Sequence, residues 1–204
     1  MGFKIDLHIH TAERSPCAHA SAVEMVTAAV ACGLDALVIT DHNRLTPASE
    51  LAALNAQCAP FRVYGGIEVH VEAEHLLVIG MDDPALEYTL WTYAGLHAFV
   101  RARAGFLALA HPFRFHGVSR NLVRRPPDAI EIHSRNTPPT AAAQIRALAS
   151  RLGLALLSNS DAHAPEELGR HYNVLPYLPA DEAALAALLR TGASCPVLAA
   201  HPRL

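Results

Sequence analysis

Short apolar runs alternate with helical patterns along almost the whole chain, and this alternation limits the possible folds more than any other feature. The runs predicted as strands are residues 3–7, 36–40, 61–64, 66–69, 75–80, 106–110, 130–133, 154–158 and 173–176. Helices are predicted at residues 21–32, 46–57, 85–103, 140–152 and 181–190. Strands that alternate with helices form a parallel sheet through crossover connections. The pattern therefore predicts a barrel or a doubly wound open sheet, and a barrel of about seven units is small beside the usual ~250 residues for eight.

Local signals support these boundaries. Ser21 and Glu24 have the spacing of a capping box, which opens a helix that Gly33 ends. Pro47 suits the first turn of the next helix. The pair Gly65-Gly66 predicts a break between two short strands.

Composition excludes several classes of protein. The chain has 204 residues, of which 51% are hydrophobic and 17% charged, so we expect one compact domain over residues 1–204 and no extended disorder. The net charge of −3 argues against non-specific binding to duplex nucleic acid. The four cysteines lack paired spacing, and no signal layout or membrane-length apolar run is present, so we expect a cytoplasmic protein.

The first strand ends in two histidines, His8 and His10. Residues i and i+2 of a strand point to the same face, so the two imidazoles should lie side by side, with Asp6 behind them on that face. Two imidazoles directed at one point are a typical start of a metal site.

Metal-ligand side chains stand at nearly every other strand end. The 204 residues include thirteen histidines, many of them at these ends. The residues at or just after these ends are Asp41, His42, Glu68, His111, Glu131, His133, Asp161 and His163, whereas His75 begins the strand predicted at 75–80. Barrel enzymes build their active sites at that edge. Imidazole and carboxylate ligands suit zinc, manganese or iron, and their number implies two or three metal ions with Glu68 as a natural bridge.

A set of motifs gives the chain a strong resemblance to one family. The motifs are DLHIHT at 6–11, ITDHN at 39–43, GIE at 66–68, HLL at 75–77, AHP at 110–112 and SDAH at 160–163. In this order they resemble the PHP family (polymerase and histidinol phosphatase). The resemblance implies an α/β fold of the distorted (β/α)7 TIM-like barrel type with up to three metal ions. Most members hydrolyse phosphate esters, and some are nuclease or proofreading domains.

The resemblance also implies a ligand set. One metal would be held by His8, His10, Glu68 and Asp161, and a second by Glu68, His75 and His111. A third would be held by His42, His163 and one residue of the loop after the first strand. That loop departs from common versions of the family, which have Asp or His there. Counting back from Ser21 puts Cys17 at the ligand position, with His19 as the alternative.

These observations predict a metal-dependent phosphoesterase. We expect it to hydrolyse a small phosphate mono- or diester, such as a histidinol-phosphate-like compound, a nucleotide or a short oligonucleotide, by attack of a hydroxide bridging two metals. Asp41 and His133 are candidates for proton transfer or for orienting groups at the site. Guanidinium groups match the geometry of phosphate, and the substrate-binding candidates are Arg114, Arg135 and Arg170.

Two other classes remain open. A metallo-amidohydrolase on a related barrel often uses a carbamylated lysine as a bridge, but Lys4 is the only lysine and precedes the first ligands. A bridge from Glu68 would still permit that reaction. A non-catalytic metal-binding PHP domain is the second alternative, although such domains have lost ligands.

Overall fold

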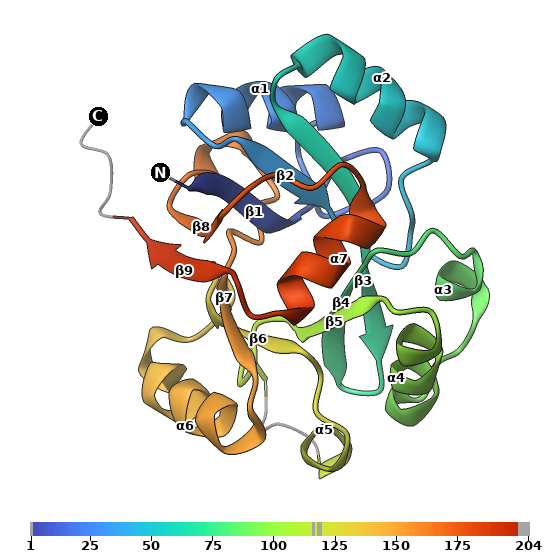
Figure 1. Ribbon diagram of the computed structural model, residues 1–204, viewed down its shortest axis with the longest axis vertical. Coiled ribbons are helices and arrows are strands. Elements are labelled where there is room, and N and C mark those ends of the chain that lie inside the picture. Colours follow the sequence, from blue (N-terminus) through green and yellow to red (C-terminus); the bar gives the residue numbers. More distant parts are fainter. Residues whose placement is uncertain (1, 116, 118–119, 200–204) are drawn as a thin grey trace.

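The computed structural model describes residues 2–115, 117 and 120–199, and its strands form one mixed sheet curved into a nearly closed barrel (Figure 1). The strand order is β7-β6-β5-β4-β3-β2-β1-β8-β9. The strands are β1 Phe3–Ile9, β2 Ala36–Ile39, β3 Arg62–Val71, β4 Glu74–Ile79, β5 Phe106–Leu109, β6 Ala129–His133, β7 Ala155–Ser158, β8 His171–Leu175 and β9 Cys195–Leu198. The helices are α1 Ala22–Ala31, α2 Ala48–Cys58, α3 Ala85–Tyr88, α4 Tyr93–Ala102, α5 Arg120–Arg124, α6 Ala142–Leu152 and α7 Glu182–Arg190, with 3-10 turns η1 Pro139–Ala141 and η2 Pro165–Glu167.

The barrel closes between its first and seventh strands at one end only. Just beyond β7, the chain pairs with the end of β1 through a parallel bridge between Ile9 and Ala162. Asp161 N donates to His8 O at 2.9 Å, and His10 N donates to Ala162 O at 2.9 Å. Two metal-ligand candidates of β1 and one of the β7 loop are therefore joined by backbone hydrogen bonds.

At the opposite end, β8 and β9 lie between β1 and β7. Strand β8 pairs antiparallel with β1, with Phe3 opposite Leu175, and β9 pairs antiparallel with β8. Side chains complete the seam, because Ser158 Oγ donates to Val197 O at 2.6 Å and Asn173 Nδ2 donates to Ser158 O at 2.8 Å. This inserted pair of strands is what distorts the barrel.

The barrel interior is packed with apolar side chains below the polar end. Inward-facing residues such as Val38, Leu77 and Phe106 form one buried cluster with Leu185 and Leu189 of α7. Figure 1 shows α7 lying across the strands, where it covers the apolar part of the interior. At the closed end of the barrel, polar side chains line the interior instead.

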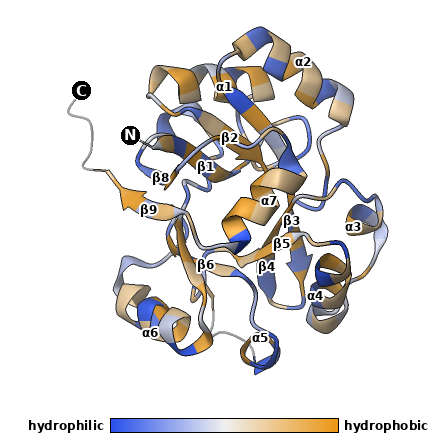
Figure 2. Cartoon of the chain, in the orientation of Figure 1, coloured by the Kyte–Doolittle hydropathy of each residue, from blue (hydrophilic) through white to orange (hydrophobic). Residues whose placement is uncertain are grey.

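The other helices cover the outer face of the sheet. Helices α1 and α2 pack on β1, β2 and the first part of β3, and α4 and α6 pack over β3 to β6. Figure 2 shows mainly hydrophobic strands, whereas the helices also carry hydrophilic residues. The capping box at the start of α1 is confirmed, with Ser21 and Glu24 bonded reciprocally. Among the described residues no helix is long and apolar enough to cross a membrane.

The expected purely parallel sheet is wrong at β4, β8 and β9, which run antiparallel to their neighbours. The reversal of β4 explains why His75 lies near the beginning of its strand rather than its end. The expected break at Gly65-Gly66 is also wrong, because β3 is continuous. Instead β3 changes partner there, from β2 up to Gly65 to β4 from Gly66 onward. A Cβ on Gly66 would lie 3.0 Å from Val78 O, so the close approach needs glycine.

The single helix expected over residues 85–103 is divided into α3 and α4. Thr89, at the end of α3, has extended backbone, and Thr92 caps α4 by accepting a hydrogen bond from Gly95 N. Leu90 is fully exposed in the connection. Helix α5 and strand β9 were absent from the expected elements, since neither is long enough to show a clear periodicity.

Candidate metal centre

The two histidines of β1 meet at their Nε2 atoms, which lie 3.0 Å apart. Both side chains are fully buried. A shift in the pairing of β1 between Asp6 and Ile9 interrupts the simple alternation of faces. Asp6 therefore does not extend the row of imidazoles, and its carboxylate accepts hydrogen bonds from the backbone N–H groups of His8 and Ser160.

Two carboxylates contact both of these imidazoles. Asp161 Oδ1 lies 3.3 Å from His8 Nε2 and 3.2 Å from His10 Nε2. Glu68 Oε2 lies 3.5 Å and 3.4 Å from the same two nitrogens. The edge of a tetrahedron around a zinc ion with bonds of ~2.0–2.1 Å is about 3.3–3.4 Å. The spacings fit one ion bound by His8, His10 and Glu68 (the inner group), whose ligand atoms lie within 4.8 Å of one another, and Asp161 contacts both imidazoles beside this group.

The hydrogen bonding of Glu68 supports this fit. Its Oε2 atom is buried and lies 2.6 Å from His42 Nδ1, a contact too poorly directed to count as a regular hydrogen bond. Buried carboxylate oxygens are normally satisfied by donors or by metal ions. The donor set of two imidazoles and two carboxylates suits zinc, manganese or iron.

The other oxygen of Glu68 faces a second pair of imidazoles. Oε1 lies 2.9 Å from His75 Nδ1 and 3.0 Å from His111 Nε2. Glu68 comes from β3, His75 from β4, and His111 follows β5, so three adjacent strands converge here. One carboxylate thus contacts two neighbouring groups of ligands, as a bridging residue would.

A third group consists of His10, His42 and His163, whose ring nitrogens all lie within 4.8 Å of one another. The rings of His42 and His163 both lie against His10, with centroids 4.2 Å and 4.3 Å from its ring and 6.0 Å from each other. The structure leaves Cys17 outside this group, exposed in the loop after β1. His19 is also exposed, and its backbone N donates to His163 O at 2.8 Å.

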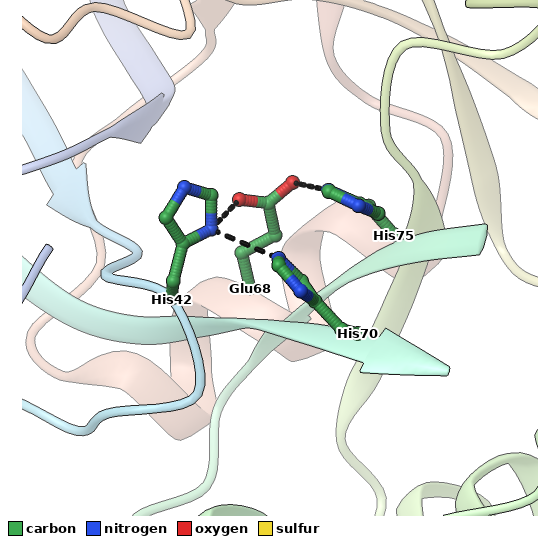
Figure 3. A group of neighbouring side chains, drawn as sticks. All are labelled: His42, Glu68, His70 and His75. Atoms are coloured by element: carbon green, nitrogen blue, oxygen red, sulfur yellow. Dashed lines mark hydrogen bonds and ion pairs between the residues drawn. The ribbon is translucent and has the colours of Figure 1, made fainter. Parts of the chain in front are cut away.

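A further histidine, His70, joins the site at the exposed end of β3. Its Nε2 lies 3.2 Å from His42 Nδ1, and its ring stacks on His75 at 3.9 Å between centroids. Figure 3 shows His42, His70 and His75 arranged around the Glu68 carboxylate. The sequence interpretation did not include His70, although the two-residue spacing from Glu68 places both on one face of a strand.

Glu131 of β6 contacts the ring nitrogen of His8 that faces away from His10. Its Oε1 lies 2.9 Å from His8 Nδ1, and the same oxygen accepts from Asn159 Nδ2 at 2.7 Å. Its Oε2 accepts from the backbone N of His111 at 2.7 Å. A carboxylate on Nδ1 directs the Nε2 lone pair of a histidine toward a metal.

Asp41 acts through Ser15 rather than by direct contact with an imidazole. Ser15 Oγ donates to Asp41 Oδ1 at 2.7 Å and lies 3.3 Å from His10 Nδ1. The same hydroxyl accepts from His42 N at 3.1 Å. Thr11 donates to Asp41 from both its backbone N and its hydroxyl. This network fixes the loop after β1 against the end of β2 and orients His10.

The buried charges favour a cation at the inner group. Burial disfavours a charged His8, yet the carboxylates of Asp161, Glu131 and Glu68 outweigh it and hold the His8 pKa well above its ordinary value. Burial raises the pKa of Glu68, but His8 and the hydrogen bonds of three further histidines bring it well below the ordinary value. Burial lowers the pKa of His10 to about 4, so its imidazole stays neutral, as a ligand requires.

Strained backbone also concentrates at the site. His111, Asp161 and Asn43, which follows His42, have φ angles of 25°, 56° and 52°. Non-glycine residues rarely adopt positive φ, and they persist where the surrounding structure over-determines them. The strand ends are therefore bent to direct these side chains inward.

The candidate substrate residues lie in two places. His133, Arg135 and Arg170 line one cavity of about 620 Å³, together with Ser160 and His171. Arg114 is exposed on the other side of the centre, with its guanidinium carbon 4.7 Å from the centroid of the Phe115 ring. The structure thus brings His133, Arg135 and Arg170 together and leaves Arg114 apart from them.

The cavity adjoins the inner ligand group through neighbouring residues. Arg135 N donates to Ser160 O at 3.1 Å, and Asn136 Nδ2 donates to Asp161 Oδ2 at 2.6 Å. Arg135 also forms an ion pair with Glu167, at 2.5 Å between Nη1 and Oε1. His133 Nδ1 is buried without a hydrogen-bond partner among the described residues.

Solved structures with this fold include proteins of several descriptions. The chain aligns over 91% of its length with 95% of a protein from Bifidobacterium adolescentis, described as a candidate metal-dependent phosphoesterase, at 14% identity and a TM-score of 0.66. It covers 98% of an amidohydrolase from Chromobacterium violaceum, using 97% of its own length, at 18% identity and a TM-score of 0.65. It covers 56% of the lesion-specific endonuclease PfuEndoQ from Pyrococcus furiosus, using 94% of its own length, at 17% identity and a TM-score of 0.64. These identities establish a shared fold.

Family models match two parts of the sequence. The PHP domain model matches residues 6–115, more than half of the chain, and the PHP-associated model matches residues 139–194. No curated protein matches the chain. The first match contains six of the strand-end ligand candidates and the second contains Asp161 and His163. The chain therefore belongs to the PHP domain family.

Proposed function

We propose that this protein hydrolyses small phosphate mono- or diesters with two to three divalent metal ions. The observation that carries the proposal is the position of Glu68, whose Oε2 faces His8, His10 and His42 and whose Oε1 faces His75 and His111. Adjacent metal positions linked by a carboxylate are typical of enzymes that carry out in-line displacement at phosphorus. When bound, the metals would lower the pKa of a water molecule and neutralise charge on the phosphoryl oxygens.

The chain's own residues prepare this centre. Glu131 and Ser15 engage the Nδ1 atoms of His8 and His10, which leaves both Nε2 atoms free to bind. We assign Asp41 a positioning role, because its carboxylate is occupied by hydrogen bonds from Thr11 and Ser15. Cys17 stays our candidate for the third metal, and its thiol would have to move from its exposed position to join His42 and His163.

The cavity beside Asp161 is the proposed place for the organic part of the ester. Its volume of about 620 Å³ lies within the usual range of ~300–1,000 Å³ for small-molecule sites. Arg135 and Arg170 line it together with Glu166 and Glu167, and Arg135 is ion-paired with Glu167, so Arg170 is the cation that we assign to the phosphate. Burial and the nearby Arg146 lower the pKa of His133, so a neutral imidazole faces the cavity and suits hydrogen bonding better than acid catalysis. A nucleotide or a small phosphorylated metabolite fits this volume and charge.

The amidohydrolase alternative has less support from the contacts of this chain. Lys4 could form a carbamylated bridge only at the centre, but its Nζ lies over the ring of Tyr172, 5.6 Å from the centroid. The bridging position belongs to Glu68. A non-catalytic metal-binding domain also has less support, because such domains have lost ligands, whereas His8, His10, Glu68 and Asp161 are all present and in contact here.

The test is hydrolysis of p-nitrophenyl phosphate and bis(p-nitrophenyl) phosphate by protein that has been stripped with a chelator and reloaded with Mn²⁺, Zn²⁺ or Fe²⁺. Asp161→Asn keeps a residue that tolerates the positive φ at this position. We expect it to weaken metal binding and to lower kcat/KM by at least about a thousandfold. Asp82→Asn, on an exposed carboxylate, is the matched control. Metal-free Asp161→Asn protein with undiminished phosphatase activity would contradict the proposal, as would activity on amides or lactones alone.

A further inference from the structure

His70 has no role in the function proposed above, yet it lies in contact with the metal centre. It is the second residue after Glu68 on β3, at the exposed end of the strand. Its Nε2 points at His42 Nδ1, 3.2 Å away, and its ring is nearly parallel to that of His75, with an interplanar angle of 24°. Stacking on His75 thus fixes the ring with its nitrogen directed at His42 (Figure 3).

Hydrogen bonding accounts poorly for the contacts of His42. Its Nδ1 lies 2.6 Å from Glu68 Oε2 and 3.2 Å from His70 Nε2. This nitrogen carries at most one proton, and one proton cannot be well directed at both neighbours. A cation bound by all three residues would remove this conflict, with His42 Nδ1 and Glu68 Oε2 moving apart from their 2.6 Å separation to bind it. The 3.2 Å separation of the two nitrogens is close to the tetrahedral edge of about 3.3–3.4 Å expected for zinc ligands.

We propose that His42 Nδ1, His70 Nε2 and Glu68 form an outer metal-binding position at the solvent-facing side of the centre. The ligand atoms of these residues and of His75 all lie within 4.8 Å of one another. Three protein ligands leave one position of a tetrahedral ion for solvent or substrate. A borderline divalent ion such as Zn²⁺ or Co²⁺ suits two imidazoles and a carboxylate.

The outer position shares a ligand with the third group described above. His42 also belongs to the group of His10 and His163. Its side chain is 21% exposed, whereas Glu68 is fully buried. His42 therefore stands between a buried group and the surface, and an ion held by His42 and His70 is the one most readily exchanged with solvent.

The test measures metal binding alone, by titrating chelator-stripped protein with Zn²⁺ and Co²⁺ and recording stoichiometry, affinity and the Co²⁺ d–d absorption. His70→Phe keeps a stacked ring on His75 but removes the nitrogen, and His70→Ala removes both. We expect each variant to lose the weakest-bound equivalent of metal, or to bind it at least about tenfold more weakly, with a changed Co²⁺ spectrum. His97→Ala, on α4 away from the centre, should titrate like the wild type.

Two results would overturn this inference. One is wild-type titration by both His70 variants, which would show that no ion uses the nitrogen. The other is wild-type titration by His70→Phe with loss of metal only in His70→Ala, which would show that the ring serves packing alone. The inference concerns the same centre as the proposed reaction, but its readout is independent of catalysis. Inactivity of the metal-loaded wild type toward phosphate esters would refute the proposed function and leave this result intact.

Discussion

His8 and His10 face each other through nitrogen atoms only 3.0 Å apart, while the opposite nitrogen of each ring is engaged from behind. If each Nδ1 carries its ring's proton, two lone pairs are directed at one another in a buried site. Such an arrangement is unfavourable unless positive charge lies between them. Without metal, the raised pKa of His8 supplies that charge as a proton. The arrangement is therefore built for a cation, and metal binding should release a proton.

Glu131 should control the affinity of the inner metal position. Glu131→Gln removes the charge and replaces one carboxylate oxygen by an amide NH2 group. This NH2 group would face an N–H group that donates to Glu131 in the wild type. We expect the affinity for the tightest-bound metal to fall about 10–100-fold, as is usual for partners of metal-bound histidines. Titration of the stripped protein with Zn²⁺ in the presence of a competing chelator measures this. The same affinity in Glu131→Gln and in an Asp82→Asn control would show that Glu131 does not orient His8.

Asp41 should matter for stability rather than for proton transfer. Asp41→Asn would place an amide N–H₂ among the donors of Thr11 and Ser15, leaving at least one buried donor without an acceptor. We expect a loss of about 1–3 kcal/mol in the free energy of unfolding, measured with urea on the stripped protein. The pH profile of kcat for the metal-loaded variant should keep its shape. A displaced profile with unchanged stability would instead identify Asp41 as a proton shuttle.

Asp6 should make the stripped protein less stable as the pH rises. Burial raises the pKa of Asp6 from 3.8 to about 7, so the folded state resists an ionisation that the unfolded state undergoes freely. Below about pH 4 both states are protonated and the penalty is absent. It grows as the pH rises toward 7 and is constant above that, at roughly 4 kcal/mol from the difference in pKa.

The measurement is urea unfolding of the stripped wild type and Asp6→Asn between pH 4 and pH 8. The free energy of unfolding of Asp6→Asn, minus that of the wild type, should increase as the pH rises through this window. This difference should become constant above about pH 7. The asparagine has a fixed cost of its own, so only the pH dependence of the difference is informative. A difference that stays constant from pH 4 to pH 8 would show that Asp6 ionises normally in the folded protein.

Arg170 should act on substrate binding through the cavity that it lines. Removing one charged hydrogen-bonding group costs about 1.5–3 kcal/mol of binding, so Arg170→Ala should raise KM by about tenfold or more. The effect should be greater for esters with a second anionic group than for p-nitrophenyl phosphate. Arg151→Ala, on the exposed end of α6, is the control. An equal effect of both variants on all esters would remove Arg170 from the proposed site.

The ligand candidates could be read from the sequence because they follow one rule. Side chains at the ends of barrel strands meet at one edge, and His8 and His111 satisfy that rule directly, whereas Glu68 lies within β3, which continues to Val71. His75 departs from it, since β4 runs antiparallel, yet its position near the start of β4 brings it to the same edge. The residue type and the strand end were enough, and knowledge of strand direction was not needed.

Other parts of the site depend on long-range geometry that a sequence does not display. The role of Glu131 requires β6 to face β1 across the barrel, and the role of Ser15 depends on how one loop folds against Asp41. The shift in β1 that separates Asp6 from the imidazoles arises from pairing with β2. The place of Cys17 also depends on loop geometry, and whether it binds a metal stays a prediction. His70 is the exception, because the two-residue spacing from Glu68 was visible.

The seam between β1 and the chain beyond β7 links the metal centre to the completion of the fold. Six of the ligand candidates lie in residues 6–115, but Asp161 and His163 arrive only when the seam between Ile9 and Ala162 has formed. An ion bound by His8, His10 and Asp161 ties together the first strand and a segment some 150 residues later. Metal binding therefore favours the state in which β1 is paired with the chain beyond β7. The free energy of metal binding adds to the stability of that state.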